Sequence, residues 1–250
     1  NTYHVEGVTA SPRDGSVLMC LAPHGGPLNL YRVDSQGSLQ RTQLTFGGQD
    51  YSCELSPDGR YVVYVHTTSL VPWHQSDVFP SEKNIRIYDT ETGTSTPDLL
   101  PSQEDPIDCG WLPDGSGVYF TTDPRTHAGS QIKVWRLDGT IQHIVSTTGS
   151  YVIDFSPNLE RIATLQHDFG SWAVQELYLA DQSMHFCANY HNAAVLYAPD
   201  GRILFSGSWE RPGIYDQITN AWQPLMPGSS TPTALLYKSG KPVRDDYEAA

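Results

Sequence analysis

One stretch of the sequence decides the fold: residues 55–65, which read LSPDGRYVVYV. Proline presets the backbone at the first position of a tight turn, and Asp and Gly tolerate the conformations that follow. The run after the turn is rich in β-branched and aromatic residues, which is typical of a strand. The stretch therefore predicts a strand, a tight turn and a second strand that folds back on the first.

The same phrase recurs through the chain. Its copies start about 40 to 56 residues apart, which is the length of a four-stranded propeller blade. Further strand-like runs follow each turn, and turn-forming residues separate them. The sequence therefore predicts an all-β fold, a β-propeller of four-stranded antiparallel blades. The copies lie at 8–15, 53–59, 109–115, 153–158 and 195–201, with a degenerate copy from Leu235.

We expect a single propeller domain over residues 1–250 with an incomplete last blade. Six blades are predicted, with the segment 2–5 helping to close the ring. Five blades followed by a tail are the alternative that the sequence leaves open. The expected blades span 5–46, 50–101, 106–146, 150–187, 191–226 and, in part, 232–250.

Two columns of the repeat predict where neighbouring blades pack together. One column is small and apolar, and the column two positions later is mostly large and apolar. Side chains two apart point to the same face of a strand, so we expect both columns to pack against a neighbouring blade. Cys53 and Cys109 belong to the first column and are interpreted as core residues, not as a disulfide, because equivalent strands of adjacent blades diverge beyond the ~7 Å Cα limit. The columns are Val8, Cys53, Cys109, Ile153 and Val195, and then Ala10, Leu55, Trp111, Phe155 and Tyr197.

The composition argues against several classes of function. The chain of 250 residues carries 15 basic and 28 acidic residues, which gives a net charge of −13. Such a surface repels phosphate backbones and anionic lipids, so no nucleic-acid partner is expected. No apolar run approaches the ~20 residues of a membrane-spanning helix, so no membrane insertion is expected either.

Residues 55–65 and the segment 43–48, which reads QLTFGG, resemble the repeats of TolB-like propellers, a family of S-P-D-G-type, WD40-like repeats. Those repeats carry S-P-D-G-[KR] before an apolar strand and an L-T-x-G-G segment ahead of it. The resemblance covers residues 5–226 as five units. It departs from the pattern at Arg13, an extra turn residue, and at 158–159, where Asn-Leu replaces Asp-Gly. It implies a propeller fold, and propellers of this type serve as periplasmic protein-binding modules, as gating domains of prolyl-oligopeptidase-like enzymes and occasionally as lyases.

The repeat also predicts where the unusual residues gather. In four-stranded blades, the loops between the second and third strands share one face of the propeller with the connections between blades. We term this face the loop-rich face; its longest loop is the insertion 67–83. Loops on a rigid scaffold often carry function, and exposed aromatic residues with Arg are the usual anchors of a binding surface. The candidate binding residues on this face are Trp73, His74, Arg125, His127, His167, Asp168, Tyr190, His191, Trp209 and Arg211.

We therefore expect a non-catalytic module without a cofactor that binds a protein or a small ligand through the loop-rich face and the central channel. Its expected location is the periplasm or another extracytoplasmic compartment. The sequence contains no G-x-S-x-G, H-E-x-x-H or phosphate-binding motif. Two alternatives stay open: a metal-dependent polysaccharide lyase or hydrolase in which His66, His167 and His191 hold a divalent metal at the channel, and a regulatory propeller domain of a larger peptidase.

Overall fold

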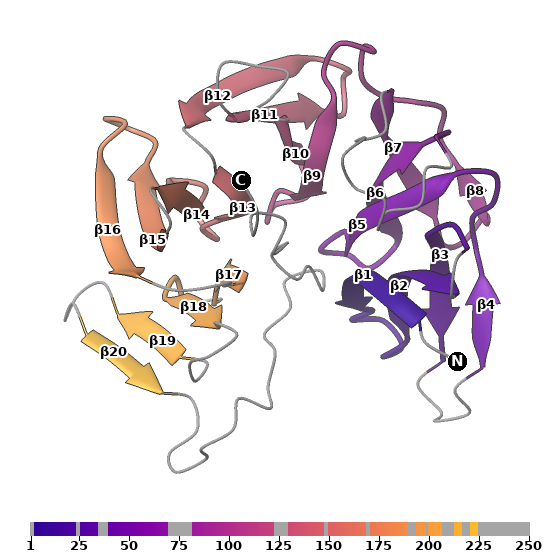
Figure 1. Ribbon diagram of the computed structural model, residues 1–250, viewed down its shortest axis with the longest axis horizontal. Coiled ribbons are helices and arrows are strands. Elements are labelled where there is room, and N and C mark those ends of the chain that lie inside the picture. Colours follow the sequence, from indigo (N-terminus) through magenta and orange to yellow (C-terminus); the bar gives the residue numbers. More distant parts are fainter. Residues whose placement is uncertain are drawn as a thin grey trace. The chain divides into compact units, whose positions relative to one another are not determined.

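The computed structural model describes residues 3–23, 26–34, 40–69, 82–122, 130–147, 150–168, 171–189, 194–198, 200–206, 213–216 and 221–224. Within these residues all regular structure is β-strand, arranged as five four-stranded antiparallel sheets (Figure 1). In each sheet the strands pair in the order in which they occur in the chain. The predicted all-β fold of four-stranded propeller blades is therefore confirmed. The predicted partial blade at 232–250 lies outside the described residues, and the number of blades stays a prediction.

The described residues divide into two compact units, 3–146 and 147–224. The first unit holds three blades. The first blade consists of β1 (Tyr3–Ala10), β2 (Val17–Pro23), β3 (Asn29–Val33) and β4 (Arg41–Gln43); the second of β5 (Gln49–Leu55), β6 (Tyr61–Thr67), β7 (Lys83–Asp89) and β8 (Thr94–Ser95); the third of β9 (Pro106–Trp111), β10 (Gly117–Thr122), β11 (Ser130–Arg136) and β12 (Ile141–Thr147).

The second unit holds two blades. Its first blade consists of β13 (Ser150–Phe155), β14 (Arg161–Asp168), β15 (Ser171–Tyr178) and β16 (Met184–Asn189), and its second of β17 (Ala194–Tyr197), β18 (Ile203–Ser206), β19 (Gly213–Asp216) and β20 (Ala221–Pro224). Within each unit the first strands of successive blades contact one another: β1 contacts β5, β5 contacts β9, and β13 contacts β17. No helix in the described part of the chain is long and apolar enough to cross a membrane.

Apolar side chains fill the spaces between the blades of the first unit. Cys53 and Leu55 pack against side chains of the first blade, and Cys109 and Trp111 pack against side chains of the second. All four are buried, and among the described residues neither cysteine forms a disulfide. In the second and third blades the two sequence columns therefore pack against a neighbouring blade, as predicted. Their partners are Leu18, Cys20 and Leu30 in the first blade, and Val63, Val65, Ile85 and Ile87 in the second.

At two places an acidic residue between these two apolar columns ties neighbouring blades together. Glu54 Oε1 accepts a hydrogen bond from the backbone N–H of Trp111 at 3.1 Å. In the second unit, Asp154 Oδ2 accepts from the backbone N–H of Tyr197 at 2.7 Å. Gly110 leaves room for the first of these bonds, since a Cβ atom there would lie 2.6 Å from Glu54 Oε2. An acidic residue before the large apolar residue thus binds the next blade.

The Pro-Asp-Gly segments form turns, as the sequence predicts. Asp58 Oδ1 accepts hydrogen bonds from the Ser56 hydroxyl at 2.5 Å and from the backbone N–H of Arg60 at 3.1 Å. The following Gly59 has a φ of 72°, in the left-handed region that glycine adopts at little cost. The corresponding Leu159 takes the same conformation with a φ of 58°. Its turn therefore carries a strain of about 1–2 kcal/mol that the glycine turns avoid.

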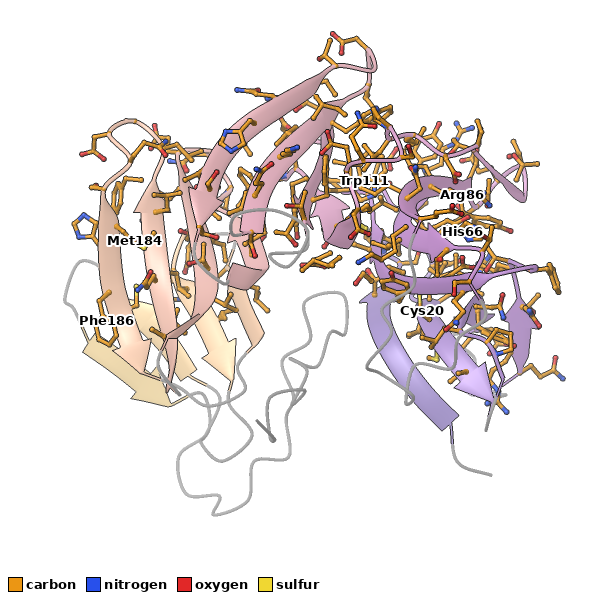
Figure 2. All side chains as sticks on the ribbon, turned by 45° about the horizontal axis from the view of Figure 1, so that its top comes forward. Cys20, His66, Arg86, Trp111, Met184 and Phe186 are labelled. Atoms are coloured by element: carbon orange, nitrogen blue, oxygen red, sulfur yellow. The ribbon has the colours of Figure 1, made fainter. Side chains whose placement is uncertain are left out.

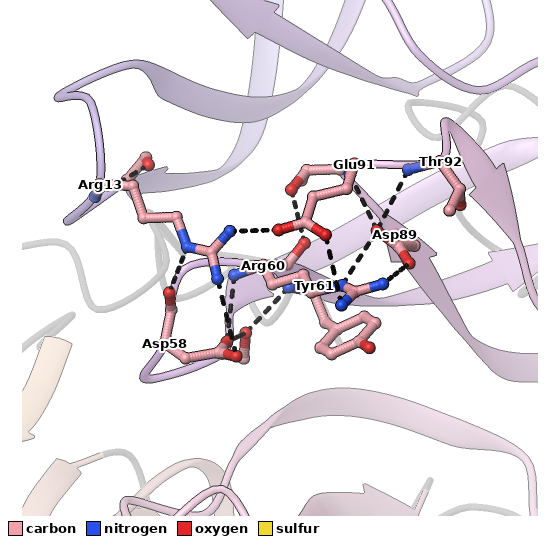
Figure 3. Close-up of polar contacts among 10 residues, drawn as sticks. Arg13, Asp58, Arg60, Tyr61, Asp89, Glu91 and Thr92 are labelled. Atoms are coloured by element: carbon pink, nitrogen blue, oxygen red, sulfur yellow. Dashed lines mark hydrogen bonds and ion pairs between the residues drawn. The ribbon is translucent and has the colours of Figure 1, made fainter.

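Arg13, the extra residue in the first turn, joins the hairpin turns of two blades (Figure 3). Its Nε donates to the backbone carbonyl of Asp58 at 2.7 Å, and its Nη1 pairs with Glu91 Oε1 at 2.7 Å. Glu91 also pairs with Arg60 at 3.3 Å, and Arg60 pairs with Asp89 at 2.7 Å. Partly exposed ion pairs stabilise by only about 0–1 kcal/mol each. The main effect of this network is therefore to fix three turns relative to one another.

Candidate functional site at the loop-rich end of the second blade

Most predicted binding residues lie outside the described residues: Trp73, His74, Arg125, His127, Tyr190, His191, Trp209 and Arg211. His167 and Asp168, which the sequence placed in a loop, belong to β14. In the backbone register, His167 is opposite Trp172 and Asp168 is opposite Ser171. The loop assignment of these two residues was wrong because β14 and β15 stay paired up to Asp168 and Ser171.

A buried polar cluster lies at the loop-rich end of the second blade. Asp50 Oδ1 lies 2.7 Å from His66 Nδ1, and the Thr45 hydroxyl donates to Oδ2 of the same carboxylate. Thr45 Oγ1 also accepts from the backbone N–H of Leu30 at 2.9 Å, which ties the cluster to the first blade. Asp50 is 1% exposed and His66 is 5% exposed. A carboxylate buried this deeply needs such partners, and here both of its oxygens have one.

A β-bulge brings Asp50 and His66 together. Near the turn, Leu55 pairs with Val62, and a regular hairpin counted back from this pair would place Asp50 opposite Thr67. The register shifts by one residue between Tyr51 and Glu54, so Asp50 pairs with His66 instead. Ser52, inside the shift, has a φ of 57°. The bulge therefore turns the imidazole and the carboxylate to the same face of the sheet.

The segment 43–48 of the TolB-like phrase builds the wall of this cluster. Thr45 supplies the hydroxyl on Asp50, as described above. A Cβ atom on Gly48 would lie 2.5 Å from His66 Cε1 and 2.6 Å from the carbonyl oxygen of Thr67. Only glycine fits there without a shift of its neighbours. The motif thus lets the connection between two blades pass directly over the imidazole ring.

The insertion after β6 starts and ends on buried residues. Thr67 and Lys83 pair across the β6–β7 ladder and are 0% and 2% exposed. Gln49 Nε2 donates to the backbone carbonyl of Ser69 at 2.9 Å, and the backbone N–H of Ser69 donates to Thr67 Oγ1 at 3.1 Å. The strand thus runs through Thr67, which places His66 inside β6 and not in the loop. The two ends of the insertion are held in a fixed position.

Two lysines fix the connection from the second blade to the third. Lys83 Nζ lies 3.2 Å from Asp105 Oδ1, and Lys133 Nζ lies 2.5 Å from Glu104 Oε2. Lys133 and Glu104 are mostly buried. Asp105 has a φ of 43°, which is unusual for a residue other than glycine. The polar base of this end therefore includes the connection 104–105 as well as Thr67 and Lys83 at the two ends of the insertion.

The arrangement of the cluster fits a structural role and not the activation of a nucleophile. In hydrolase triads the imidazole stands between the hydroxyl and the carboxylate, so that it removes the hydroxyl proton. Here Asp50 stands between Thr45 and His66, and the hydroxyl is bound to the carboxylate. The Nδ1 atom of His66, one of the candidate metal ligands, is occupied by Asp50. Among the described residues, no group of three or more His, Cys, Asp or Glu side chains is placed to hold a metal ion.

Solved structures share this fold. A putative TolB from Agrobacterium tumefaciens is 20% identical, with a TM-score of 0.59 over 74% of this chain and 65% of its own. TolB from Acinetobacter baumannii is 15% identical, with a TM-score of 0.66 over 88% of this chain and 53% of its own. A chain of a nidogen/laminin complex is 11% identical, with a TM-score of 0.65 over 87% of this chain and 78% of its own. The fold is therefore a β-propeller similar to that of TolB.

The same fold occurs in proteins with other activities. A prolyl endopeptidase is 16% identical to this chain, and an oligogalacturonate lyase in complex with manganese is 15% identical. The chain spans 65% and 53% of the lengths of the two TolB chains. No protein-family model and no curated protein sequence matches this chain. At these identities the likeness establishes the fold alone.

Proposed function

We propose that this chain is a non-catalytic propeller module that binds a partner protein through its loop-rich face. The observation that carries the proposal is the contrast between the two ends of the second blade. At one end, short turns are closed by their own side chains and by the pairs around Arg13. At the other end, the insertion 67–83 starts and ends on a buried polar base. A loop held on a rigid base can present binding residues at low entropic cost.

The residues that we propose as anchors on this face are Trp73, Trp209 and Arg211. Large aromatic side chains and Arg dominate the binding energy of protein interfaces. Binding of a nucleic acid is disfavoured by the net charge of −13. A small ligand in the central channel is the other form that this proposal allows.

The comparisons support a protein partner. The similar structures include two TolB proteins and a chain of a nidogen/laminin complex, which is itself a protein–protein complex. We further propose an extracytoplasmic, periplasmic location, because the TolB-like propellers that the sequence resembles act there. A single propeller domain over the whole chain is part of the same proposal.

Two alternatives rest on the other similar structures. A lyase of the kind seen with manganese would use His66, His167 and His191 as metal ligands. Against it, Asp50 occupies one nitrogen of His66, and the ring is buried under the connection between two blades. Metal analysis of protein purified without a His-tag tests this alternative: stoichiometric manganese or zinc would favour it. A regulatory role beside a peptidase domain would instead be favoured by a hydrolase domain encoded after Ala250.

The binding proposal is tested by capture with the immobilised chain, followed by an affinity measurement with the purified partner. Trp73→Ala, Trp209→Ala and Arg211→Ala are combined in one variant. We expect this variant to lose at least about tenfold in affinity, because anchors of this type cost 1.4 kcal/mol or more when truncated. Its unfolding temperature should stay close to that of the wild type.

The matched control is Leu137→Ala. Leu137 is 61% exposed and lies in the turn between β11 and β12, at the opposite end of a blade. This control should bind the partner as tightly as the wild type. Equal affinity of the triple variant and the wild type would overturn the proposal, and so would a loss of binding in the Leu137 control alone.

A further inference from the structure

A cavity of about 220 Å³ opens beside the buried cluster, between the connection 44–46 and the strands β6 to β8. It lies within the first unit, where the edge of the first blade meets the second. His66 of β6 and Arg86 of β7, both labelled in Figure 2, line it. Its lining includes Phe46, Tyr64, His66, Arg86, Tyr88 and Ser95.

The floor of the cavity is polar and already paired. Tyr64 donates its hydroxyl to Ser95 Oγ at 2.8 Å, and His66 pairs with Asp50 at 2.7 Å. Burial raises the pKa of the Tyr64 hydroxyl well above its usual value, so this group stays protonated even where an exposed tyrosine would ionise. The floor is therefore fixed by its own bonds before any ligand enters, which lowers the cost of binding.

The rim carries an aromatic side chain that faces solvent. Phe46 is 72% exposed, the highest value among the large apolar side chains that are exposed in the described residues. Tyr88, also in the lining, is 7% exposed. The Phe46 ring is therefore available to cover an apolar group that enters the cavity, and that contact would remove apolar surface of both from water.

Arg86 supplies the hydrogen-bond donors with which the cavity can bind an anion. Its Nε donates to Asp98 Oδ1 at 2.7 Å, and the two side chains are 27% and 49% exposed. That bond uses one edge of the guanidinium and leaves the two Nη groups without a partner among the described residues. Among the described residues of the lining the only carboxylate is Asp50, which is 1% exposed and bound by His66 and Thr45. Asp98 is therefore the carboxylate with which a ligand would compete for Arg86.

We propose that this cavity binds a carboxylate on an apolar stem, with the carboxylate on Arg86 and the stem against Phe46 and Tyr88. A guanidinium matches a carboxylate through two parallel hydrogen bonds. The volume lies below the roughly 300–1,000 Å³ of pockets for drug-sized ligands, so it accommodates a single side chain or chain end. The cavity is built from residues other than the proposed anchors, and its test needs no partner protein.

The probes are two small carboxylates and their neutral amides. N-acetyl-phenylalanine presents a chain-terminal carboxylate, and the α-amide of N-acetyl-glutamate presents a side-chain carboxylate. The controls are N-acetyl-phenylalaninamide and the α-amide of N-acetyl-glutamine. Each is titrated into the full chain labelled with ¹⁵N and followed by NMR. We expect saturable shifts at residues around the cavity with a Kd on the order of 1 mM for an acid, and about tenfold weaker binding of its amide. Whichever acid binds more tightly identifies the source of the carboxylate.

Three variants separate the roles of the lining. Arg86→Lys keeps the charge but removes the paired hydrogen bonds, so we expect about tenfold weaker binding of the acid. Phe46→Ala should weaken binding about fivefold through the lost stem contact. Asp98→Asn removes the carboxylate that competes for Arg86, so binding should tighten by about threefold.

The matched controls leave the cavity unchanged. Arg202→Lys alters another surface arginine that pairs with an aspartate, and Leu137→Ala removes another exposed apolar side chain. Both should bind the acid as the wild type does. Equal binding of the acid and its amide would overturn the proposal. So would shifts that map to the cluster around Arg13 and Arg60, the absence of saturable shifts, or an Asp98→Asn variant that binds more weakly.

Discussion

The turns of the first two blades meet at Gly59, and this contact gives a quantitative prediction. A methyl group on Gly59 would lie 2.9 Å from both Cγ and Cδ of Pro12 and 3.1 Å from Cγ of Arg13. Gly115 holds the same position in the turn of the third blade, with a φ of 71° against 72°. An added Cβ on Gly115 would meet no atom of the described residues within 4 Å. Gly59→Ala and Gly115→Ala therefore share a backbone cost and differ in the contact with the first blade.

The magnitudes follow from these two terms. A non-glycine residue in the left-handed region costs about 1–2 kcal/mol, and both variants carry this cost. The proline ring cannot turn away from the new methyl group of Gly59→Ala, so the turns must move apart. Overpacking of this kind costs about a further 1–3 kcal/mol. Gly59→Ala should therefore lower the free energy of unfolding by about 1–3 kcal/mol more than Gly115→Ala, which corresponds to about 2–12 °C in Tm for a chain of this size.

Urea and thermal unfolding followed by circular dichroism measure both variants. Pro12→Ala, combined with Gly59→Ala, completes a double-mutant cycle. Removal of the ring should recover at least half of the extra loss, because the methyl group then has space. Equal losses for Gly59→Ala and Gly115→Ala, or a cycle without coupling, would refute the contact between the two turns.

Three further predictions concern other positions. The hydrogen bond from Arg60 lowers the pKa of Asp89 to about 2. The stability that this pair contributes is therefore present above about pH 4 and is lost as the pH falls towards 2. In Asp89→Asn, the free energy of unfolding should depend less on pH over this range. Leu159→Gly should relieve left-handed strain and raise the free energy of unfolding by up to about 1 kcal/mol, measured in urea; a loss of that size would count against the strain. Gly48→Ala should cost about 1–3 kcal/mol, because its methyl group would overlap His66, and an unchanged Tm would contradict the packing described here.

The blade architecture could be predicted because the turn residues, the strand-like runs and the repeat all indicated the same fold. Proline-marked turns fixed where the first and second strands meet, and the run 61–65 fitted only an extended chain. The burial of Cys53 and Cys109 also followed from the repeat, since residues in one column of a repeat share one environment. The pairing of two strands on either side of a tight turn depends only on residues close in the chain, so it can be predicted from the sequence.

The polar cluster could not be predicted, because its geometry depends on an irregularity. Regular counting from the turn would put Asp50 opposite Thr67, and only the bulge at Ser52 places it opposite His66. A β-bulge leaves no distinctive sequence signal here, since Ser52 is not a glycine. One signal was present and not used: the acidic residue between the two apolar columns, as in Glu54, which binds the next blade.

The extra Arg13 shows a related limit. The sequence marks it as a departure from the repeat, but its partners Asp58 and Glu91 lie 45 and 78 residues away in the chain. Contacts of this kind depend on how two blades pack, which periodicity does not specify. The cavity beside Phe46 could not be predicted from the sequence for the same reason, because it forms where the edge of one blade meets the next.

Site-specific photo-cross-linking tests the central claim, that the loop-rich face binds the partner, most directly. A benzoylphenylalanine side chain replaces Trp73 in one protein and Leu137 in another, and each is irradiated with the purified partner. We predict a cross-linked product from position 73 and none from position 137. A product from position 137 alone would contradict the assignment of the binding face.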